Sequence, residues 1–401
     1  MPTVQNINAE KSPIVGIQAE NDRKYRQSDE IQAKDFEIKA VHENGQTTAL
    51  RPEDVDISRK TPQKTGNTTE VDITLKSDKS LKTTVKVTNE RNKVISFECG
   101  FPNVKDVVAI LYSNGELCFE GEGDVLQYKD GDYPWKSYDN KNENPIKSVS
   151  FEKNVNPEYL DNYFSNIETL EYVENIPSSV ISLNKTFQNC IALDKVPDLS
   201  DCTKLLDMTN TFMGCTTLKK IPEIPKNVRN IDGICQECSL LRTVPDLSKA
   251  VGVITAKNAF ADCSTLTNAE VAPNTENMEA MFMNCINLKI MPEIPNTVTN
   301  MDSAFDNNIS LSKLSTIPSS VKTMENIFYE CSKLEGELIV ESTPDKYNGA
   351  FKGAAVATKL NLTGSSKVLD GLALTAGETS NITVNGNKPV NQANTTMETA
   401  E

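Results

Sequence analysis

An aromatic residue, a cysteine and a leucine recur along the sequence, three positions apart, and this repeat constrains the fold more than any other feature. The complete copies are Phe187-x2-Cys190-x2-Leu193, Phe212-x2-Cys215-x2-Leu218, Phe260-x2-Cys263-x2-Leu266, Phe282-x2-Cys285-x2-Leu288 and Phe328-x2-Cys331-x2-Leu334. Degenerate copies begin at Phe164, Cys235, Phe305 and Phe351, so successive copies start 22–25 residues apart. Such a period indicates a solenoid, in which each coil buries its apolar residues against the next. We expect about nine coils of 22–25 residues over residues 146–355.

Most units also contain an apolar residue followed by proline, as in Ile221-Pro222 and Val244-Pro245. Because proline has no N–H to donate to a sheet, it ends a strand. We predict one short strand near Leu-x2-Ile-Pro, a turn marked by proline, and a short helical arc that ends near Phe-x2-Cys. Three positions depart from the pattern: Cys235 stands in the aromatic position, Asn308 stands in the cysteine position, and the repeat fades at Ala354.

The repeating unit resembles the BspA-like leucine-rich repeats and the related DUF285 family of bacterial surface proteins. The run Asn114-Gly115-Glu116-Leu117-Cys118-Phe119, followed by Pro134-Trp135, is similar to the segment that leads into the repeats of BspA-like proteins. The resemblance implies a curved, right-handed solenoid that serves in adhesion and recognition. A fold by itself does not determine a function, so this remains an expectation.

Residues 15–90 alternate apolar and polar residues in short stretches, as β-strands do. Strands are expected at residues 36–40, 55–57, 71–75 and 83–87. Asn44-Gly45 predicts a hairpin turn. The pattern indicates a β-sandwich and resembles the bacterial Ig-like domains of group 3. That resemblance implies a spacer module, with a subunit contact and a ligand site as the alternatives. The whole chain is thus expected to be mainly β with short helices.

The remaining segments are expected to cap the solenoid or to extend from it. Residues 91–145 would form a β-rich linker and N-terminal cap, in which Phe119, Tyr133 and Trp135 cover the first coil. An aromatic platform for a sugar is the alternative role of these rings. The other segments are an N-terminal arm at residues 1–14, a C-terminal cap at 356–386, and a flexible tail or docking peptide at 387–401.

The formal net charge of the 401-residue chain is −15, which argues against nucleic acid as a partner because phosphate recognition needs a basic face. No apolar run reaches the length of a membrane span, so we expect no membrane insertion. No export leader or sorting motif is recognised in the sequence, so secretion by the usual route is not expected.

Ten cysteines raise the question of metal binding or disulfides. Seven of them occupy repeat positions, where a free cysteine serves as a small buried apolar residue. Cys235-x2-Cys238 has the spacing of half a zinc site, but no second pair stands at a matching distance. We therefore expect buried free thiols, no metal, no disulfide framework and folding in the cytosol.

No motif in the sequence supports catalysis, and we expect neither an enzyme nor a cofactor. A nucleophile elbow, a phosphate-binding loop and a zinc-protease motif are all missing from the sequence. The only histidine, His42, lies in the expected hairpin, where we expect a solvated side chain. Acidic residues are numerous, so a glycosidase with two carboxylates is not excluded by composition.

One surface feature suggests a binding face. Basic residues follow the repeat leucines by one or two positions: Lys195, Lys219, Lys220, Arg242, Lys289 and Lys313. These positions should point away from the core and could form a positive stripe for an anionic polymer, such as a teichoic acid or an acidic capsule glycan. The alternative is a solvated face kept soluble by lysine. Acidic neighbours such as Asp194 and Glu335 favour the alternative.

A spacer, a cap and a solenoid together suggest a displayed binding protein. Since no leader is recognised, we expect a bacteriophage virion surface protein: a head fibre, a decoration protein or a tail-associated host-binding protein. Residues 1–90 would contact a capsid or tail protein, and the solenoid a bacterial surface glycan or protein receptor. The alternatives are a bacterial cell-surface adhesin of the BspA type and, less favoured, an intracellular scaffold or enzyme. A homo-oligomer stays open.

Overall fold

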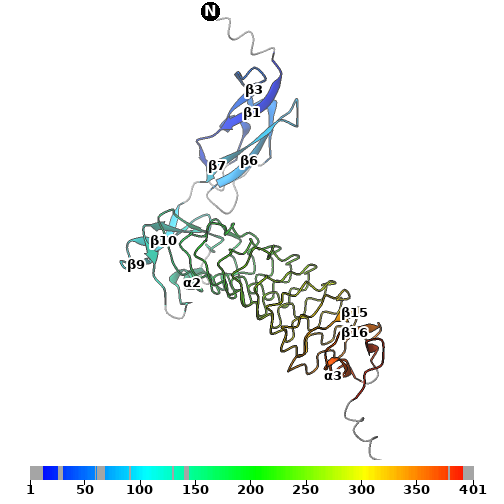
Figure 1. The fold of residues 1–401 in the computed structure, drawn as a ribbon. Coiled ribbons are helices and arrows are strands. Elements are labelled where there is room, and N and C mark those ends of the chain that lie inside the picture. The colour runs from blue at the N-terminus through cyan, green and yellow to red at the C-terminus, as the bar shows by residue number, and fades with distance from the viewer. Residues whose placement is uncertain are drawn as a thin grey trace, which may run out of the picture. The chain divides into compact units, whose positions relative to one another are not determined.

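The structure, a computed structural model, describes residues 12–25, 30–58, 60, 68–89, 92–128, 131–139, 144–377 and 380–391. The chain is mainly β-structure with a few short helices (Figure 1). It divides into two compact units: residues up to 96 together with 110–118, and residues 97–109 together with those from 119 onward. Most of the expected N-terminal arm and C-terminal tail lies outside the described residues.

The first unit contains two sheets. One has the order β1-β3-β4, formed by β1 (Ile14–Glu20), β3 (Glu37–His42) and β4 (Thr47–Ala49). The other has the order β2-β7-β6-β5, formed by β2 (Lys24–Tyr25), β7 (Lys82–Asn89), β6 (Thr68–Leu75) and β5 (Val55–Ile57). Single-turn 3-10 helices occur at η1 (Ala33–Asp35) and η2 (Pro52–Asp54). The four strands expected from the sequence are present within a few residues, whereas β1 and β2 were not expected.

Alternating residues place one face of each sheet in a shared core. In β6, Val71, Ile73 and Leu75 are buried, while the polar residues between them are more exposed. Ile17 and Ile38 from the other sheet belong to the same buried cluster. The hairpin turn between β3 and β4 is confirmed, and Gly45 takes a φ of 79°, which glycine adopts without strain.

His42 is buried at the end of β3, so the expectation of a solvated side chain is wrong. The residue is 5% exposed. Its Nδ1 lies 2.7 Å from the carbonyl oxygen of Ser12, and its Nε2 lies 2.7 Å from Oγ1 of Thr48. Because a carbonyl only accepts, Nδ1 donates to Ser12, and Nε2 shares the second hydrogen bond with the Thr48 hydroxyl. Both ring nitrogens therefore serve to hold the hairpin.

A cap of strands and aromatic side chains precedes the solenoid. One sheet has the order β14-β13-β11-β10-β8, formed by β14 (Tyr172–Val173), β13 (Ser148–Phe151), β11 (Glu116–Gly121), β10 (Val107–Tyr112) and β8 (Lys93–Glu98). A two-stranded ladder joins β9 (Gly100–Phe101) to β12 (Asp124–Val125), and α2 (Pro134–Asp139) follows. Trp135, Tyr133 and Phe119 are buried, with ring centroids 5.1 and 5.2 Å from that of Trp135. The three rings pack against one another in the interior and are not an open platform for a sugar.

The cap also completes the hydrogen bonding of the first coil. Within the solenoid, N–H groups of one coil donate to carbonyls of the next, as from Phe187 to Thr211 at 3.0 Å. On the first coil, side chains of the cap supply the donors. The pairs are Gln127 Nε2 with the Tyr159 carbonyl (2.6 Å), Tyr133 Oη with the Asp161 carbonyl (2.9 Å) and Trp135 Nε1 with the Tyr163 carbonyl (2.9 Å).

Parallel bridges recur at one place in each coil, five residues before the aromatic position, and reproduce the period of the sequence (Figure 1). They connect Tyr159, Ser182, Asp207, Asn230, Thr255, Asn277, Asn300, Thr323 and Lys346. The main ladder was expected at Leu-x2-Ile-Pro, where bridges such as that between Tyr172 and Lys195 are more scattered. The missing N–H of proline limits pairing there.

The arc around each aromatic residue is a series of turns, not the short helix that we expected. Residues two before and two after the aromatic take positive φ, as Asn162 (60°) and Asn166 (63°) do around Phe164. In later coils these positions are Lys185, Asn189, Asn210, Gly214, Gly233, Glu237, Asn258, Asp262, Ala280, Asn284, Ser303, Asn307, Asn326, Glu330, Gly349 and Gly353. The left-handed residues turn N–H groups toward the neighbouring coil, which prevents hydrogen bonding four residues back along the chain.

Ladders of equivalent side chains fill the core of the solenoid. The rings of Phe187 and Phe212 stack with centroids 5.8 Å apart. Sγ of Cys215 lies 3.1 Å from the carbonyl oxygen of Phe187 in the preceding coil, and equivalent cysteines repeat this contact. All ten cysteines are free and buried, which confirms the expected packing role.

Parallel pairing continues beyond residue 355, into the segment expected to form the C-terminal cap. β15 (Gly336–Ile339), β16 (Leu360–Thr363) and β17 (Ile382–Val384) form a parallel sheet, and α3 (Leu369–Leu374) precedes β17. The N–H of Phe351 donates to Oγ1 of Thr375 at 2.9 Å. That hydroxyl stands where a further coil would offer a carbonyl.

Candidate functional site

The six basic residues predicted to form a binding face are all exposed. Each follows a repeat leucine by one or two positions, between two residues that point into the core. In one coil, for example, Leu218 and Ile221 are buried, and Lys219 and Lys220 between them face solvent. The two buried residues anchor the segment, so the basic side chains are held outward by the fold.

The structure brings these basic residues together in two groups rather than in one stripe. Three consecutive coils carry the first group: Lys195, Lys219, Lys220 and Arg242. Arg242 N donates to the carbonyl of Lys219 at 3.4 Å, which places these two residues on adjacent coils. The next coil has Thr267 at this position, and its N–H donates to the Arg242 carbonyl. Lys289 and Lys313, on the two coils after that, form the second group.

The proline-marked turns of the first coils enclose a hollow of about 730 Å³. Lys195 and Lys220 line it, together with the ring of Tyr172 and the prolines Pro197 and Pro222. Its acidic lining residues are Glu174, Asp194, Asp198 and Glu223. The hollow thus offers both charge signs beside an apolar surface.

A second hollow, of about 590 Å³, uses the same turns of later coils. Asp246, Glu270 and Glu293 line it, beside Ser248 and Pro292. We name the two hollows together the turn groove, defined by residues 172–174, 194–198, 220–223, 246–248, 269–271 and 292–293.

Carboxylates outnumber cations in the turn groove. The first hollow has four carboxylates and two lysines, and the second has three carboxylates and no basic residue among those described. The predicted positive stripe is therefore interleaved with negative charge. An anionic polymer as the ligand stays a prediction.

Two of these carboxylates are held in the ionised form by neighbouring serines. The hydroxyl of Ser200 donates to Asp198 at 2.5 Å and that of Ser248 donates to Asp246 at 2.5 Å. These hydrogen bonds, with the backbone N–H of the same serines, lower the pKa of both aspartates. Both side chains therefore carry full negative charge at neutral pH.

The acidic row was missed at the level of sequence, although a signal was present. Asp198, Glu223, Asp246 and Glu293 each directly follow the proline that marks the turn. The basic residues after each leucine were predicted to form a row on the surface, whereas the equally regular acidic position after each proline was not. Comparing the charge at each position of the aligned repeat units would have found both the basic and the acidic row.

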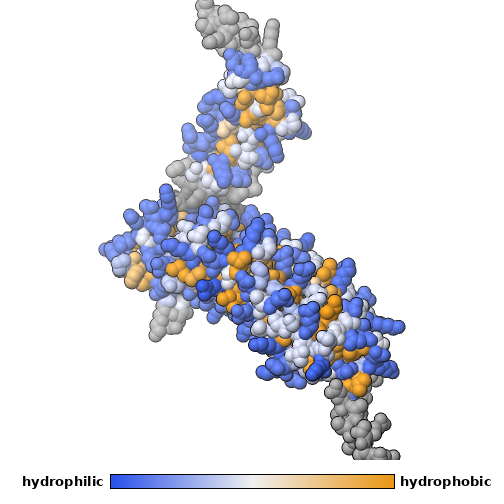
Figure 2. Space-filling model, in the orientation of Figure 1, coloured by the Kyte–Doolittle hydropathy of each residue, from blue (hydrophilic) through white to orange (hydrophobic). Residues whose placement is uncertain are grey.

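Hydrophobic residues on the face of the solenoid in Figure 2 lie in small groups among polar ones. Exposed apolar side chains such as Leu206, Leu240 and Ile254 are spread over different coils. Scattered apolar residues are normal on a soluble surface and do not by themselves mark a site. The charged turn groove is therefore the more distinctive feature.

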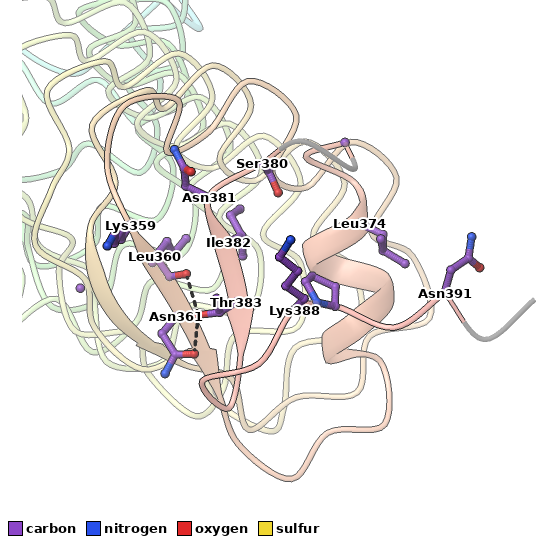
Figure 3. Close-up of a pocket in the computed structure, with 13 residues that line it drawn as sticks. Lys359, Leu360, Asn361, Leu374, Ser380, Asn381, Ile382, Thr383, Lys388 and Asn391 are labelled. Atoms are coloured by element: carbon purple, nitrogen blue, oxygen red, sulfur yellow. Dashed lines mark hydrogen bonds between the residues drawn. The ribbon is translucent and has the colours of Figure 1, made fainter. Parts of the chain in front are cut away.

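A third hollow, of about 840 Å³, lies at the C-terminal end of the solenoid, between β16, β17 and α3 (Figure 3). Asn361 and Thr383 line it, and Oγ1 of Thr383 donates to Oδ1 of Asn361 at 2.9 Å. Lys359 and Lys388 contribute positive charge at its exposed rim. These amides, hydroxyls and ammonium groups can bind a polar ligand.

The groups with strongly shifted pKa values do not support nucleophilic chemistry. Burial raises the pKa of Cys99 to about 12 and that of Cys202 to about 11. Burial also raises the pKa of Cys190, Cys215 and Cys285. A protonated buried thiol is a poor nucleophile. Partial burial, with the nearby charge of Glu330, raises the pKa of Asp306 to about 6. Asp306 lies beside the aromatic position and is not among the residues that line the turn groove.

No helix in the described part of the chain combines the length and the apolar character needed to cross a bilayer. Within the same residues, no cluster of three or more histidine, cysteine, aspartate or glutamate side chains is arranged to hold a metal ion.

Comparison with known proteins gives one family. The model described as "BspA type Leucine rich repeat region" matches residues 138–267, 184–303 and 254–376, more than half of the chain. No curated protein matches.

Three solved structures are similar at low identity. A leucine-rich repeat protein from Bacteroides ovatus is 18% identical, over 73% of this chain and 76% of that one, with a TM-score of 0.43. A leucine rich cell surface protein from Faecalibacterium prausnitzii is 18% identical, over 68% and 96%, with a TM-score of 0.29. A leucine-rich repeat protein from Eubacterium ventriosum is 12% identical, over 66% and 95%, with a TM-score of 0.27. On the family match and the coils described above, the chain belongs to the BspA-type leucine-rich repeat family.

Proposed function

We propose that the protein is a non-enzymatic binding protein of the bacterial cell surface, and that its turn groove holds a polymeric ligand. The observation that carries this proposal is the repetition of charged side chains at the same turn of consecutive coils. The family assignment supports it, because BspA-like repeats are those of bacterial surface proteins.

A repeated groove suits a repeated ligand. Coils stacked as parallel strands recur roughly every 4.8 Å, so equivalent side chains form a row of nearly identical subsites. Each exposed charge contributes little on its own, about 1 kcal/mol or less. A polymer that contacts several coils adds these contributions within one molecule, as multivalent binders do.

The placement on a phage particle, expected from the sequence, finds no support in the comparisons, and we do not extend the proposal to it. For the first unit we propose the spacer role of an Ig-like module. Its two sheets pack around one core, and both ring nitrogens of its only histidine are engaged in structural hydrogen bonds.

Binding of the whole protein to bacterial cells and to purified cell-wall glycans tests the proposal. The decisive variant is Lys195→Glu/Lys220→Glu, because both lysines line the first hollow. Lys204→Glu/Lys226→Glu is the matched control: it makes the same charge change at exposed lysines of the same two coils, outside the turn groove. We expect the first variant to lose about tenfold in affinity and the control to change less than twofold.

Two results would reject the proposal. If the wild-type protein binds none of the cells or glycans tested, the solenoid is not a cell-surface receptor for them. If both double variants lose affinity equally, binding depends on net charge and not on the groove.

A further inference from the structure

Four coils repeat one order of opposite charges at or beside the turn groove, and in the first two of them the basic residue itself lines a hollow. A basic residue, one or two intervening residues, a proline and a carboxylate follow each other along the chain. The segments are Lys195-Val196-Pro197-Asp198, Lys220-Ile221-Pro222-Glu223, Arg242-Thr243-Val244-Pro245-Asp246 and Lys289-Ile290-Met291-Pro292-Glu293. Before the proline, Ile221, Val244 and Met291 are buried and Val196 is half-buried, so the two charged side chains of each segment stand on either side of the proline turn.

The opposite charges do not neutralise each other. Among the described residues, none of the four basic residues forms an ion pair with the carboxylate of its own segment. Asp198 and Asp246 instead accept hydrogen bonds from Ser200 and Ser248, which fix them on the far side of the turn. Asp246 also forms an exposed ion pair with Lys249 at 3.9 Å, whereas Asp198 and Glu223 form none among the described residues. The charges of the first hollow are therefore available to a ligand.

A ligand with one sign of charge fits this surface poorly. A polyanion that reaches Lys195 and Lys220 also meets Asp198 and Glu223 in the same hollow. A polycation attracted by the carboxylates meets the two lysines. Like charges brought together at an interface cost several kcal/mol, so either ligand loses most of what it gains. Charge complementarity is complete only for a ligand that carries both signs.

Part of the groove backbone is already paired between coils. Tyr172 and Lys195 pair in a parallel bridge, and the N–H of Asp194 donates to the carbonyl of Glu171 at 3.2 Å. These backbone groups are thus already used between coils, and an extended peptide cannot join them as another strand. Beside these paired groups, the hollow offers side chains and the flat faces of Pro197 and Pro222, which suit a chain of sugar rings.

We propose that the ligand of the turn groove is a linear glycan polymer that carries both ammonium and anionic groups along its length. The ammonium groups face the carboxylate row, and the anionic groups face the basic row. This inference rests on the proposed function, which gives the groove a polymeric ligand, and it replaces the polyanion expected from the sequence by a polymer of mixed charge.

Three soluble polymers separate the charge classes. Carboxymethyl chitosan carries both signs, carboxymethyl dextran is anionic, and diethylaminoethyl dextran is cationic. Their affinities for the whole protein would be compared by calorimetry at about 0.15 M salt, where the Debye length is about 8 Å and contact pairs dominate. We expect carboxymethyl chitosan to bind about tenfold more tightly than either of the other two.

Two double variants with near-isosteric substitutions show which row of charges contributes to binding of each polymer. Lys195→Gln/Lys220→Gln removes positive charge only, and we expect it to weaken binding of the mixed polymer and to strengthen binding of the cationic one. Asp198→Asn/Glu223→Gln removes negative charge only, and we expect it to shift preference toward the anionic polymer. Lys204→Gln/Lys226→Gln, outside the groove, should leave the order of the three polymers unchanged. Unfolded protein cannot produce these opposite changes in preference, so the readout does not depend on stability alone.

The outcomes distinguish this inference from the proposed function. If the wild-type protein prefers the anionic polymer, or binds all three equally, the mixed-charge ligand is wrong even where binding to cells depends on the groove. If sedimentation shows that the groove variants abolish self-association and change no polymer affinity, a second copy of the chain occupies the groove, and the inference is also wrong. If neither cells nor polymers bind, the proposed function itself fails.

Discussion

The side-chain amide of Asn308 donates to the backbone carbonyl of Phe282 in the preceding coil, at 2.7 Å. In neighbouring coils a cysteine thiol makes this contact, as Cys285 does with the carbonyl of Phe260 at 3.1 Å. Cysteine at this position is therefore more than a small apolar residue: it supplies a donor to a buried carbonyl. Asn308 keeps the donor but adds Oδ1, which is buried and has no hydrogen-bond partner among the described residues.

Replacing Asn308 by cysteine should stabilise the protein. Asn308→Cys keeps a donor for the Phe282 carbonyl and removes the unpaired acceptor, whose burial costs about 1–3 kcal/mol. We expect the free energy of unfolding, measured by urea denaturation, to rise by about 1 kcal/mol.

Asn308→Ala is the control for this prediction, because it removes the side-chain donor as well and leaves the Phe282 carbonyl with only the backbone N–H of Cys285 at 3.3 Å. It should be less stable than Asn308→Cys. Equal stability of the two variants would show that the hydrogen bond to Phe282 contributes nothing.

In the arcs, a positive φ should decide whether an exchange between glycine and alanine raises or lowers the free energy of unfolding. Gly233 has a φ of +61°, and a Cβ there would lie 2.0 Å from Oδ1 of Asn210, so Gly233→Ala should cost about 2 kcal/mol or more. Ala280 has a φ of 51°, and Ala280→Gly should stabilise by up to about 1 kcal/mol by relieving the left-handed strain.

Ala256→Gly is the matched control for these exchanges. Ala256 is also buried but is not among the residues with positive φ, so its replacement should destabilise by about 1 kcal/mol. A stabilising Ala256→Gly, or a destabilising Ala280→Gly, would contradict the role of backbone handedness. Chemical denaturation of the three variants measures these differences.

Asp306 should make stability depend on pH between about 4 and 6. Its folded pKa of about 6 lies above the ordinary value, so the charged form is disfavoured in the folded state, and stability falls as pH rises through this window. Asp306→Asn mimics the protonated carboxyl. Near pH 4 we expect the variant and the wild type to have the same free energy of unfolding. Above pH 7 we expect the variant to be more stable by about 1 kcal/mol, a value that already allows for the partial exposure of the side chain.

Glu330→Gln provides an independent check on the cause of the Asp306 shift. Removing the charge of Glu330 should move the titration of Asp306 to lower pH, because its repulsion contributes to the raised pKa. A titration unchanged by Glu330→Gln would assign the shift to burial alone. Thermal melting of both variants over pH 4–8 measures these effects.

Hydrogen bonds from the cap to the first coil should contribute more to the free energy of unfolding than a hydrogen bond on the exposed surface. Tyr133→Phe removes the donor to the partly buried Asp161 carbonyl and should cost about 1 kcal/mol. Tyr172→Phe removes an exposed hydrogen bond to Glu174 and should cost less than about 0.5 kcal/mol. If the two variants are equally stable, the cap covers the first coil without completing its hydrogen bonds.

The period of the solenoid could be read from the sequence because the Phe-x2-Cys-x2-Leu spacing records which residues point inward. The bridge ladder from Tyr159 to Lys346 follows the same spacing. The alternating strands of the first unit were predictable for a similar reason, since burial in β6 follows every second residue.

The conformation of the arcs was not predicted, because the decisive property is backbone handedness. Asparagine and glycine at positions such as Asn166 and Gly214 signal it, but Lys185, Ala280 and Glu330 adopt the same φ without any such preference. His42 was misjudged for a related reason: its burial depends on Ser12 and Thr48, contacts that no local pattern records.

For the turn groove, the exposure of the basic residues was predictable from their place between two buried residues. The mixed charge of the groove was not recognised, because it depends on two different positions of the repeat considered together. Lys195 and Asp198 belong to different positions of the repeat, and only the turn brings both into one hollow.

The stacking of coils has a direction. Each arc offers N–H groups toward the C-terminal end and carbonyls toward the N-terminal end, so its two ends are chemically unlike. Gln127, Tyr133 and Trp135 match the first end, and Thr375 matches the last. Insertion or deletion of an interior coil should therefore leave both termini unchanged, because the same backbone hydrogen bonds join successive arcs. Lengthening by duplication would extend the array of charged turns and leave both caps unchanged, so the length of the charged surface is set by the number of coils.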